Sequence, residues 1–249
     1  MPDGHVDGQV WHYELDPAVP GWNNEAEAYT NHPKNVRIQD GTLLLEAHRE
    51  TYRYPNDPEH KKYKITSGRI DTRDSFTFNY GKIEATMKIP AGQGTWPAFW
   101  LLSANEPNDA SISTQSPLRN NDRFYLLTGG ELDIMEAYSG AQLEGTFNNF
   151  KSSPSRRIPV ADASTTFHTY GLEVTPNTIT WTVDGKPYFQ QKKSAALPTD
   201  PAVWPYGKDN QLYVIFNLAM GGAAGKPNPH QSSWQLAVKD LKFYPYTSQ

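Results

Sequence analysis

The most restrictive feature of the chain is its division into short segments in which polar and apolar side chains alternate. Residues 82–89 and 178–183 are the clearest examples. A period of two is the pattern of β-strands that have one buried face and one solvated face. No segment shows an apolar stripe with a helical period over more than a few turns. The chain is therefore predicted to be all-β.

Turn residues separate these segments, with 18 Gly and 20 Pro among 249 residues. Asp40-Gly41 and Asp184-Gly185 each lie between two alternating segments, which is typical of a two-residue hairpin and favours antiparallel pairing. These features favour a two-sheet antiparallel sandwich that forms a single domain over residues 1–249. The predicted strands cover residues 36–38, 42–48, 64–71, 76–89, 98–102, 130–136, 143–150, 166–174, 178–183, 186–191, 211–219 and 233–244.

Residues 131–136 read Glu-Leu-Asp-Ile-Met-Glu and combine three carboxylates with three apolar side chains. In a regular strand, Glu136 would lie on the face opposite to Glu131 and Asp133. A β-bulge at residues 134–135 would add one residue and bring all three acids to the same face. Clustered, desolvated carboxylates are costly, so this segment indicates a functional site.

Two glutamates that flank an aspartate suit retaining glycoside hydrolysis, in which one carboxylate attacks the anomeric carbon and the other protonates the leaving oxygen. Their carboxyl groups are then expected to lie about 5 to 5.5 Å apart. Asp133 would hydrogen-bond the nucleophile and help to keep the acid protonated. The motif is short, and taken alone it also fits a solvated acidic strand or a site for a hard cation.

Composition narrows the partners of the chain. The net charge is −4 and no basic stripe is present, so nucleic acid is not an expected partner. No apolar run approaches the roughly 20 residues that span a bilayer, and no membrane association is expected. Residues 1–10 lack the basic and apolar parts of a signal peptide. The absence of Cys excludes disulfides. The expected state is an extracellular monomer.

Several motifs accompany the acid segment, in the order in which a known family carries them. They include Gly-Trp-Asn-Asn-Glu at 21–25, Ser-Gly-Arg-Ile-Asp-Thr-Arg at 67–73, Tyr-Gly-Lys-Ile-Glu-Ala at 80–85, Gly-Thr-Trp-Pro-Ala-Phe-Trp at 94–100, Phe-His-Thr-Tyr at 167–170 and Asn-Leu-Ala-Met-Gly-Gly at 217–222. In these residues the chain resembles glycoside hydrolase family 16, and within it the laminarinase-like enzymes that cut β-1,3-glucans. The resemblance implies a β-jelly-roll sandwich with a concave sugar-binding groove.

The resemblance also implies an endo-acting enzyme that needs no cofactor and hydrolyses internal β-1,3 or mixed β-1,3/1,4 linkages of a polysaccharide. In such an enzyme Glu131 is the nucleophile, Glu136 the general acid/base and Asp133 the assisting residue. Substrate-binding roles are implied for Trp96, Trp100, Asn23, Asn24 and Arg73, with His168 as a further candidate.

The longest irregular stretch, residues 103–128, leads directly into the acid segment. Loops of this length are usually functional or disordered. The aromatic and apolar run at 124–127 favours a wall of the sugar-binding groove, to which Phe124 and Tyr125 would contribute.

Three positions depart from the family pattern. Lys239 stands where many relatives have an Asp that helps to hold calcium, and because a cation does not bind a cation we expect no metal there. Asn148 replaces a frequent His, and Ala223-Ala224 follow a Gly pair where relatives often have Trp. Loss of these rings predicts weaker affinity for plain laminarin.

Other activities stay open on these residues. A galactan such as agar or carrageenan is one alternative substrate, and Arg119, Arg123, Arg156 and Arg157, placed in flanking loops, would suit a sulfated chain. Transfer of the glycan to another sugar is a second alternative. The third is a non-catalytic glucan-binding module, although both Glu131 and Glu136 are retained.

Overall fold

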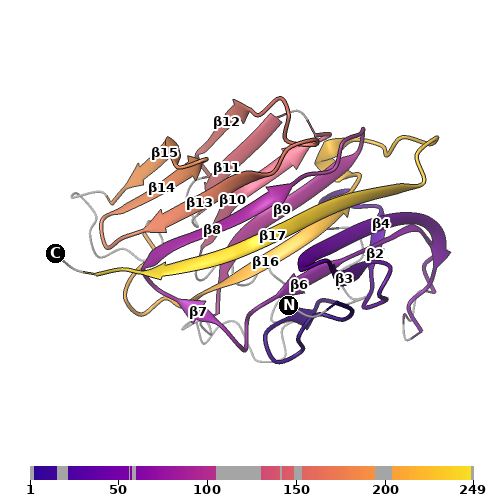
Figure 1. The fold of residues 1–249 in the computed structure, drawn as a ribbon, viewed down its shortest axis with the longest axis horizontal. Coiled ribbons are helices and arrows are strands. Elements are labelled where there is room, and N and C mark those ends of the chain that lie inside the picture. Colours follow the sequence, from indigo (N-terminus) through magenta and orange to yellow (C-terminus); the bar gives the residue numbers. More distant parts are fainter. Residues whose placement is uncertain are drawn as a thin grey trace.

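The computed structural model describes residues 3–15, 22–55, 57, 60–104, 130–140, 142–148, 153–193 and 204–247. In these residues the chain forms two β-sheets packed face to face (Figure 1). Every pair of strands in the described ranges is antiparallel except β2 with β5. The described part contains no helix long and apolar enough to cross a membrane. The predicted all-β sandwich is confirmed.

Within the described residues, the sheet that carries the acid segment has eight strands in the order β1-β6-β16-β9-β10-β11-β12, with β7 paired to β16. Its strands are β1 (His12–Tyr13), β6 (Arg69–Asp71), β7 (Thr77–Phe78), β9 (Thr95–Ser103), β10 (Glu131–Tyr138), β11 (Gln142–Asn148), β12 (Ser155–Pro159) and β16 (Leu212–Met220).

The second sheet has nine strands among the described residues, in the order β15-β14-β13-β8-β17-β4-β5-β2, with β3 paired to β4. Its strands are β2 (Glu27–Tyr29), β3 (Val36–Gln39), β4 (Thr42–Tyr52), β5 (Tyr63–Ser67), β8 (Gly81–Lys88), β13 (His168–Val174), β14 (Thr178–Val183), β15 (Lys186–Lys192) and β17 (Ser233–Pro245). Two short 3₁₀ helices, η1 (Trp22–Asn24) and η3 (Gly222–Ala224), lie next to each other.

Both predicted hairpin turns are confirmed. Asp40-Gly41 joins β3 to β4 and Asp184-Gly185 joins β14 to β15, and all four residues have positive φ, between 50° and 73°. Positive φ at both central residues is the requirement of the type I′ turn. The Asp-Gly pairs therefore set the register of two hairpins directly from local sequence.

Two predicted strands are each divided in the structure. The segment 64–71 changes sheets at Gly68, where a Cβ atom would lie 2.8 Å from the Asn35 carbonyl oxygen and would also overlap the Val36 side chain. The segment 76–89 breaks before Gly81, whose φ is 147°. The prediction also missed the short strands β1, β2 and β12, because two to five residues show too little alternation to stand out.

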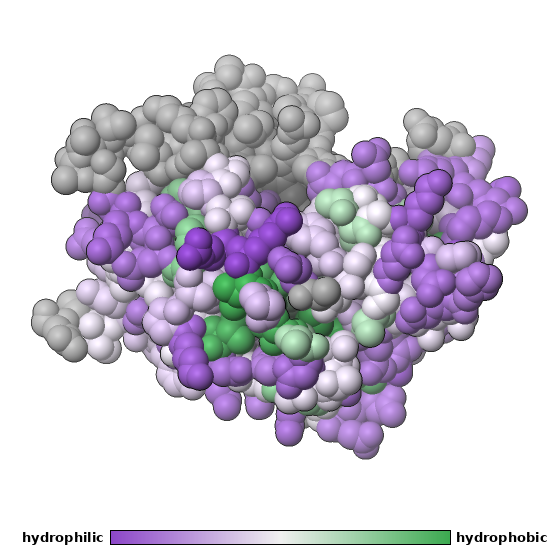
Figure 2. Space-filling model, turned by 90° about the horizontal axis from the view of Figure 1, so that it is seen from above, coloured by the Kyte–Doolittle hydropathy of each residue, from purple (hydrophilic) through white to green (hydrophobic). Residues whose placement is uncertain are grey.

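The hydrophobic core fills the space between the two sheets. Phe99 and Phe216 of the eight-stranded sheet stack with ring centroids 4.7 Å apart, and Trp181 of the opposite sheet is fully buried. The strands β12 and β15 lie against each other, so the sheets meet at that edge. Figure 2 views the molecule from the top of Figure 1 and shows a central hydrophobic patch surrounded by hydrophilic residues.

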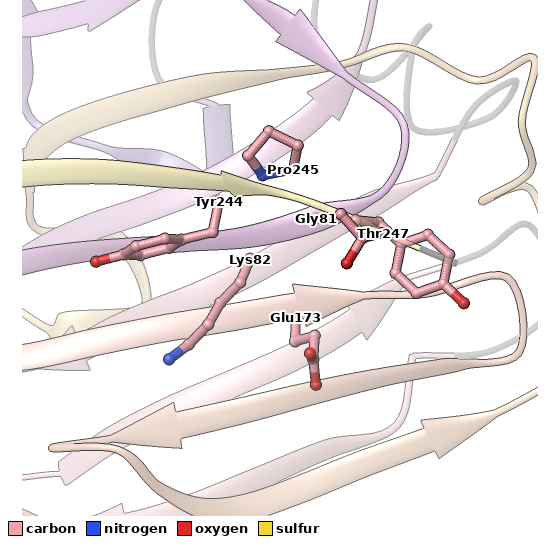
Figure 3. A pocket seen from close by; sticks show the side chains of 7 residues that line it. Gly81, Lys82, Glu173, Tyr244, Pro245 and Thr247 are labelled. Carbon is pink, nitrogen blue, oxygen red and sulfur yellow. The ribbon is translucent and has the colours of Figure 1, made fainter. Parts of the chain in front are cut away.

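A shallow hollow lies on the outer face of the nine-stranded sheet, near the end of β17 (Figure 3). It is lined by Lys82, Glu173 and the exposed rings of Tyr244 and Tyr246. Lys82, Glu173 and Tyr244 belong to the sheet that does not contain the acid segment, and Tyr246 follows the end of its strand β17. The hollow is therefore separate from the site described next.

Candidate active site

The predicted β-bulge is present in β10. On one side, Asp133 pairs with Thr146 and Glu136 with Glu144, so Ile134 and Met135 together oppose Gly145. The register towards β9 shifts at the same place. Because of this additional residue, all three acids share one face of β10, while the apolar side chains between them are buried in the core.

Three aromatic side chains hold the backbone of this irregular strand. The Trp181 indole N–H donates to the Asp133 carbonyl oxygen at 2.8 Å, and the Tyr188 hydroxyl lies 3.4 Å from the Ile134 carbonyl oxygen. The Tyr206 hydroxyl donates to the Glu131 carbonyl oxygen at 2.8 Å. A bulge interrupts the hydrogen-bond ladder, and Trp181 and Tyr188 supply donors to carbonyl groups of the interrupted segment. None of the three was expected from the sequence.

Gly145 is required by this arrangement, and we predict that Gly145→Ala damages both stability and activity. A Cβ atom there would lie 2.7 Å from Cδ1 of Trp181 and would overlap the Tyr188 hydroxyl. Forced overpacking typically costs about 1 to 3 kcal/mol of unfolding free energy. Thermal unfolding and kcat should both fall. In the matched variant Gly207→Ala the new methyl group meets no atom within 4 Å, and both values should stay close to those of the native chain.

The acids receive hydrogen bonds from two neighbouring strands. The Asn148 side-chain amide donates to Glu131 Oε1 at 2.9 Å and to Asp133 Oδ2 at 3.1 Å. The Trp96 indole N–H donates to Glu136 Oε1 at 2.8 Å. Asp133 is only 5% exposed, and the two glutamates are partly buried. The Asn148 amide thus bridges two of the three acids.

Burial raises the pKa of each of the three carboxyl groups. For Glu131 the nearby Glu136 adds to the increase, while the Asn148 amide and the Arg69 cation lower the pKa. For Asp133 both glutamates raise the pKa further. Three carboxyl groups placed this close cannot all ionise cheaply, and this repulsion adds to the increase in pKa that burial causes.

The two tryptophans of β9 lie on the same face as the acids. Trp96 contacts Tyr138 with ring centroids 5.2 Å apart, beside Glu136. The Trp100 indole N–H donates to Asn217 Oδ1 at 2.8 Å, and the Arg69 guanidinium lies 4.9 Å from the Trp100 ring centre. Both indole rings are only partly buried. The structure therefore brings these predicted sugar-binding residues to the site.

Asn23 and Asn24 belong to η1, are exposed and have φ of 53° and 62°. Gly222 lies between the backbone of η1 and the Trp96 ring. A Cβ atom at Gly222 would lie 2.7 Å from the Asn23 carbonyl oxygen and 3.0 Å from the Trp96 ring. Glycine is needed for this approach. The two asparagines are therefore close to the aromatic part of the site.

Arg73 lies near Trp100 on the acid-bearing face of the eight-stranded sheet, with Tyr213 between them. Its guanidinium donates to the Tyr213 hydroxyl at 2.6 Å and lies 4.8 Å from the centre of that ring. Tyr213 in turn packs in a small cluster that includes Trp100. Arg73 is therefore connected to the site through aromatic side chains.

The structure does not bring His168, a further candidate for substrate binding from the sequence, to the acid-bearing face. It lies on β13 of the nine-stranded sheet, with Nδ1 2.8 Å from Asp184 Oδ2 and Nε2 3.1 Å from Asp162 Oδ1. Both ring nitrogens thus have carboxylate partners, which gives this residue a structural role. Phe124 and Tyr125 lie outside the described residues, and their proposed place in the groove stays a prediction.

Two further charged residues occupy the acid-bearing face and were not assigned to the site from sequence. Glu144 on β11 is opposite Glu136, and Arg157 on β12 is opposite Glu144. Arg156 and Arg157 therefore belong to a strand, whereas the sequence placed them in a loop. In the sequence, Glu144 could be placed opposite Glu136 only by counting residues back across the β10–β11 hairpin. That count requires the register of the bulged pair.

Among the residues that the structure describes, no cluster of three or more His, Cys, Asp or Glu side chains has the arrangement of a metal site. The ammonium of Lys239, where no bound metal is expected from the sequence, lies 6.0 Å from the centre of the Phe167 ring.

Three acids lie along one bulged strand of a β-sandwich, with indole rings beside them. This combination defines a carbohydrate-active hydrolase. The chain belongs to glycosyl hydrolases family 16, whose family model matches residues 23–235. It is 32% identical to glucan endo-1,3-beta-glucosidase A1 of Niallia circulans over 87% of the chain, although it spans only 32% of that protein.

The chain is also 31% identical to a beta-glucanase of Rhodothermus marinus, over 97% of the chain and 81% of that protein. The crystal structure of the laminarinase from Rhodothermus marinus superposes with a TM-score of 0.83 at 29% identity, covering 99% of this chain and 94% of that one. The fold of the relatives thus extends over essentially the whole chain.

Proposed function

We propose that the protein is a retaining endo-β-glucanase that hydrolyses internal β-1,3 or mixed β-1,3/1,4 linkages. The observation that carries this proposal is the bulge in β10, which places Glu131, Asp133 and Glu136 on one face. The names of the relatives supply the substrate class, since they are called endo-1,3-beta-glucosidase, beta-glucanase and laminarinase.

In the proposed mechanism, an oxygen of the Glu131 carboxylate forms a bond to the anomeric carbon while the glycosidic C–O bond breaks. Glu136 gives its proton to the departing sugar oxygen. The ionised Glu136 then takes a proton from a water molecule, whose oxygen attacks the same carbon and releases Glu131. Trp96 and Trp100 offer ring faces on which sugars next to the cleavage point would stack.

The surroundings of the two glutamates support these roles. Burial and the nearby Glu136 raise the pKa of Glu131 to about 8, and the Asn148 amide and the Arg69 cation oppose that increase, in the direction that a nucleophile requires. Burial and the Glu144 carboxylate raise the pKa of Glu136, as a proton donor requires, although the Trp96 and Tyr138 donors lower it. The Asn148 amide donates to both Glu131 and Asp133, so it holds these two side chains next to each other.

We also propose that residues 1–249 act as one catalytic domain, because the described strands of both sheets share a single main core. The proposal includes an extracellular monomer that works on polysaccharide without a cofactor. Galactan hydrolysis, glycan transfer and non-catalytic glucan binding remain the alternatives, and a single set of assays separates them.

The test is turnover of a panel of laminarin, mixed-linkage β-glucan, agar and carrageenan, with analysis of product size and linkage. On the preferred glucan we expect internal cleavage, and ¹H NMR should show the β-anomer as the first product, because two displacements retain the configuration. A crystal structure should place the Glu131 and Glu136 carboxyl groups about 5 to 5.5 Å apart. Initial release of the α-anomer, or binding of glucan without cleavage, would contradict the proposal.

A further inference from the structure

Three charged side chains lie side by side on three adjacent strands, and the first of them is the proposed acid. Glu136 of β10 pairs with Glu144 of β11, and Glu144 pairs with Arg157 of β12. Directly paired residues of antiparallel strands lie side by side on the same face. The acid-bearing face therefore continues from Glu136 through a fourth carboxylate to a cation at the edge of the sheet.

The members of this row are in close contact. The Arg157 Nε donates to Glu144 Oε2 at 2.8 Å, with the Glu144 side chain 9% and the Arg157 side chain 61% exposed. The Arg157 guanidinium also lies 5.6 Å from the centre of the Tyr138 ring. Tyr138 contacts Trp96, which donates to Glu136. Arg157 thus contacts both Glu144 and Tyr138, the two residues that lie next to the proposed acid on this side.

Glu136 has titratable groups on several sides. Glu131, Asp133 and Tyr138 lie on its own strand, Glu144 faces it from β11 and Arg157 from β12. Trp96 of β9 donates to it, and Tyr188 of β15 lies beneath the bulge. The Glu144 carboxylate raises the pKa of Glu136 and the Arg157 cation lowers it. A buried carboxylate beside Glu136 would repel its ionised form strongly if it had no partner.

We propose that Glu144 and Arg157 form a positioning pair that sets the proton balance of Glu136 and thereby the upper pH limit of hydrolysis. The inference rests on the role of Glu136 proposed above. Arg157 favours the ionised form of Glu136, so its removal should let Glu136 keep its proton to higher pH. Glu144 favours the protonated form, so loss of its charge should have the opposite effect.

The test is the pH dependence of kcat/KM, whose alkaline limb reports the group that must be protonated in the free enzyme. Arg157→Gln should move this limb up by about half a pH unit, a size suited to a partly exposed charge. Glu144→Gln, which keeps the shape of the side chain, should move it down by a similar amount. The double variant should lie close to the native profile, and Arg157→Lys should restore most of the native limb.

Arg156→Gln is the matched control, because it removes the same charge from the preceding residue of β12, which faces the other side of the strand. It should leave the alkaline limb in place. The thermal unfolding temperature of every variant shows whether a shifted pH profile is accompanied by a loss of stability. A limb that is unchanged in both single variants, or that moves in the same direction in both, overturns the proposal.

A second measurement keeps this inference distinct from the proposed function. The ¹³C chemical shift of the Glu136 carboxyl group, followed through a pH titration, reports its proton without any turnover. Opposite shifts of that titration in Arg157→Gln and Glu144→Gln support the pair even if Glu136 proves not to be the acid. An unchanged titration in both variants overturns the pair even if hydrolysis and retention are as proposed.

Discussion

Replacement of Glu131 by Gln is expected to lower kcat/KM on the preferred β-glucan by at least about 10⁴-fold while glucan binding is largely retained. The amide has the shape of the carboxylate, and the Tyr206 hydroxyl would still hold the backbone at this residue. It cannot, however, form the covalent bond to the anomeric carbon. The measurement is steady-state hydrolysis together with a binding titration of an oligosaccharide.

The control for this variant is Glu173→Gln, which removes an exposed carboxylate from the outer face of the other sheet. That change should leave kinetics and binding unaltered. Residual activity of Glu131→Gln above a few per cent would show that another group attacks the sugar. Loss of oligosaccharide binding would show instead that the carboxylate is needed to hold the substrate.

Replacement of Glu136 by Ala should reduce hydrolysis of glucan by about 10² to 10⁴-fold, the usual contribution of a positioned acid or base. The loss should be much smaller at the first step for a substrate with a good leaving group, which departs without a proton. With such a substrate, the second step becomes limiting because no base activates water. Azide, a nucleophile that needs no base, should then accelerate turnover and release a β-glycosyl azide.

The azide experiment distinguishes the two glutamates. In Glu131→Gln no covalent intermediate forms, so azide should not restore activity by the same route or give a product of the same configuration. If azide fails to accelerate turnover by Glu136→Ala, or if the azide product is the α-anomer, the assignment of nucleophile and acid/base is wrong. Product configuration is read directly by ¹H NMR.

Much of the fold follows from short-range patterns in the chain. Alternation at 82–89 and 178–183 predicts β8 and β14, and two Asp-Gly pairs predict the hairpins that the structure contains. Local sequence fails at Gly68, where the chain leaves one sheet for the other without losing its extended form. Extended backbone looks the same in either sheet, so alternation cannot reveal such a crossing.

The acid row could be predicted from sequence because a phase argument suffices for it. Six residues with three acids and three apolar side chains are consistent with one buried face only if one residue is added at 134–135, and the structure has the bulge there. The side-chain period of a strand is a property of the covalent backbone, so it needs no knowledge of neighbours. With the requirement that the three acids act together, the sequence by itself thus predicted the strand, its bulge and the face that carries the acids.

Only the tertiary structure decided which groups surround those acids. Trp181 reaches the bulge from the opposite sheet, Arg157 stands beside Glu144 through the register of β11 and β12, and His168 lies on the other sheet with its own aspartates. Hydrogen bonds and charge interactions act over a few ångströms in space, and the neighbours at that distance depend on register and sheet packing. Those are properties of the assembled sandwich, because a shift of one residue in any strand exchanges its two faces.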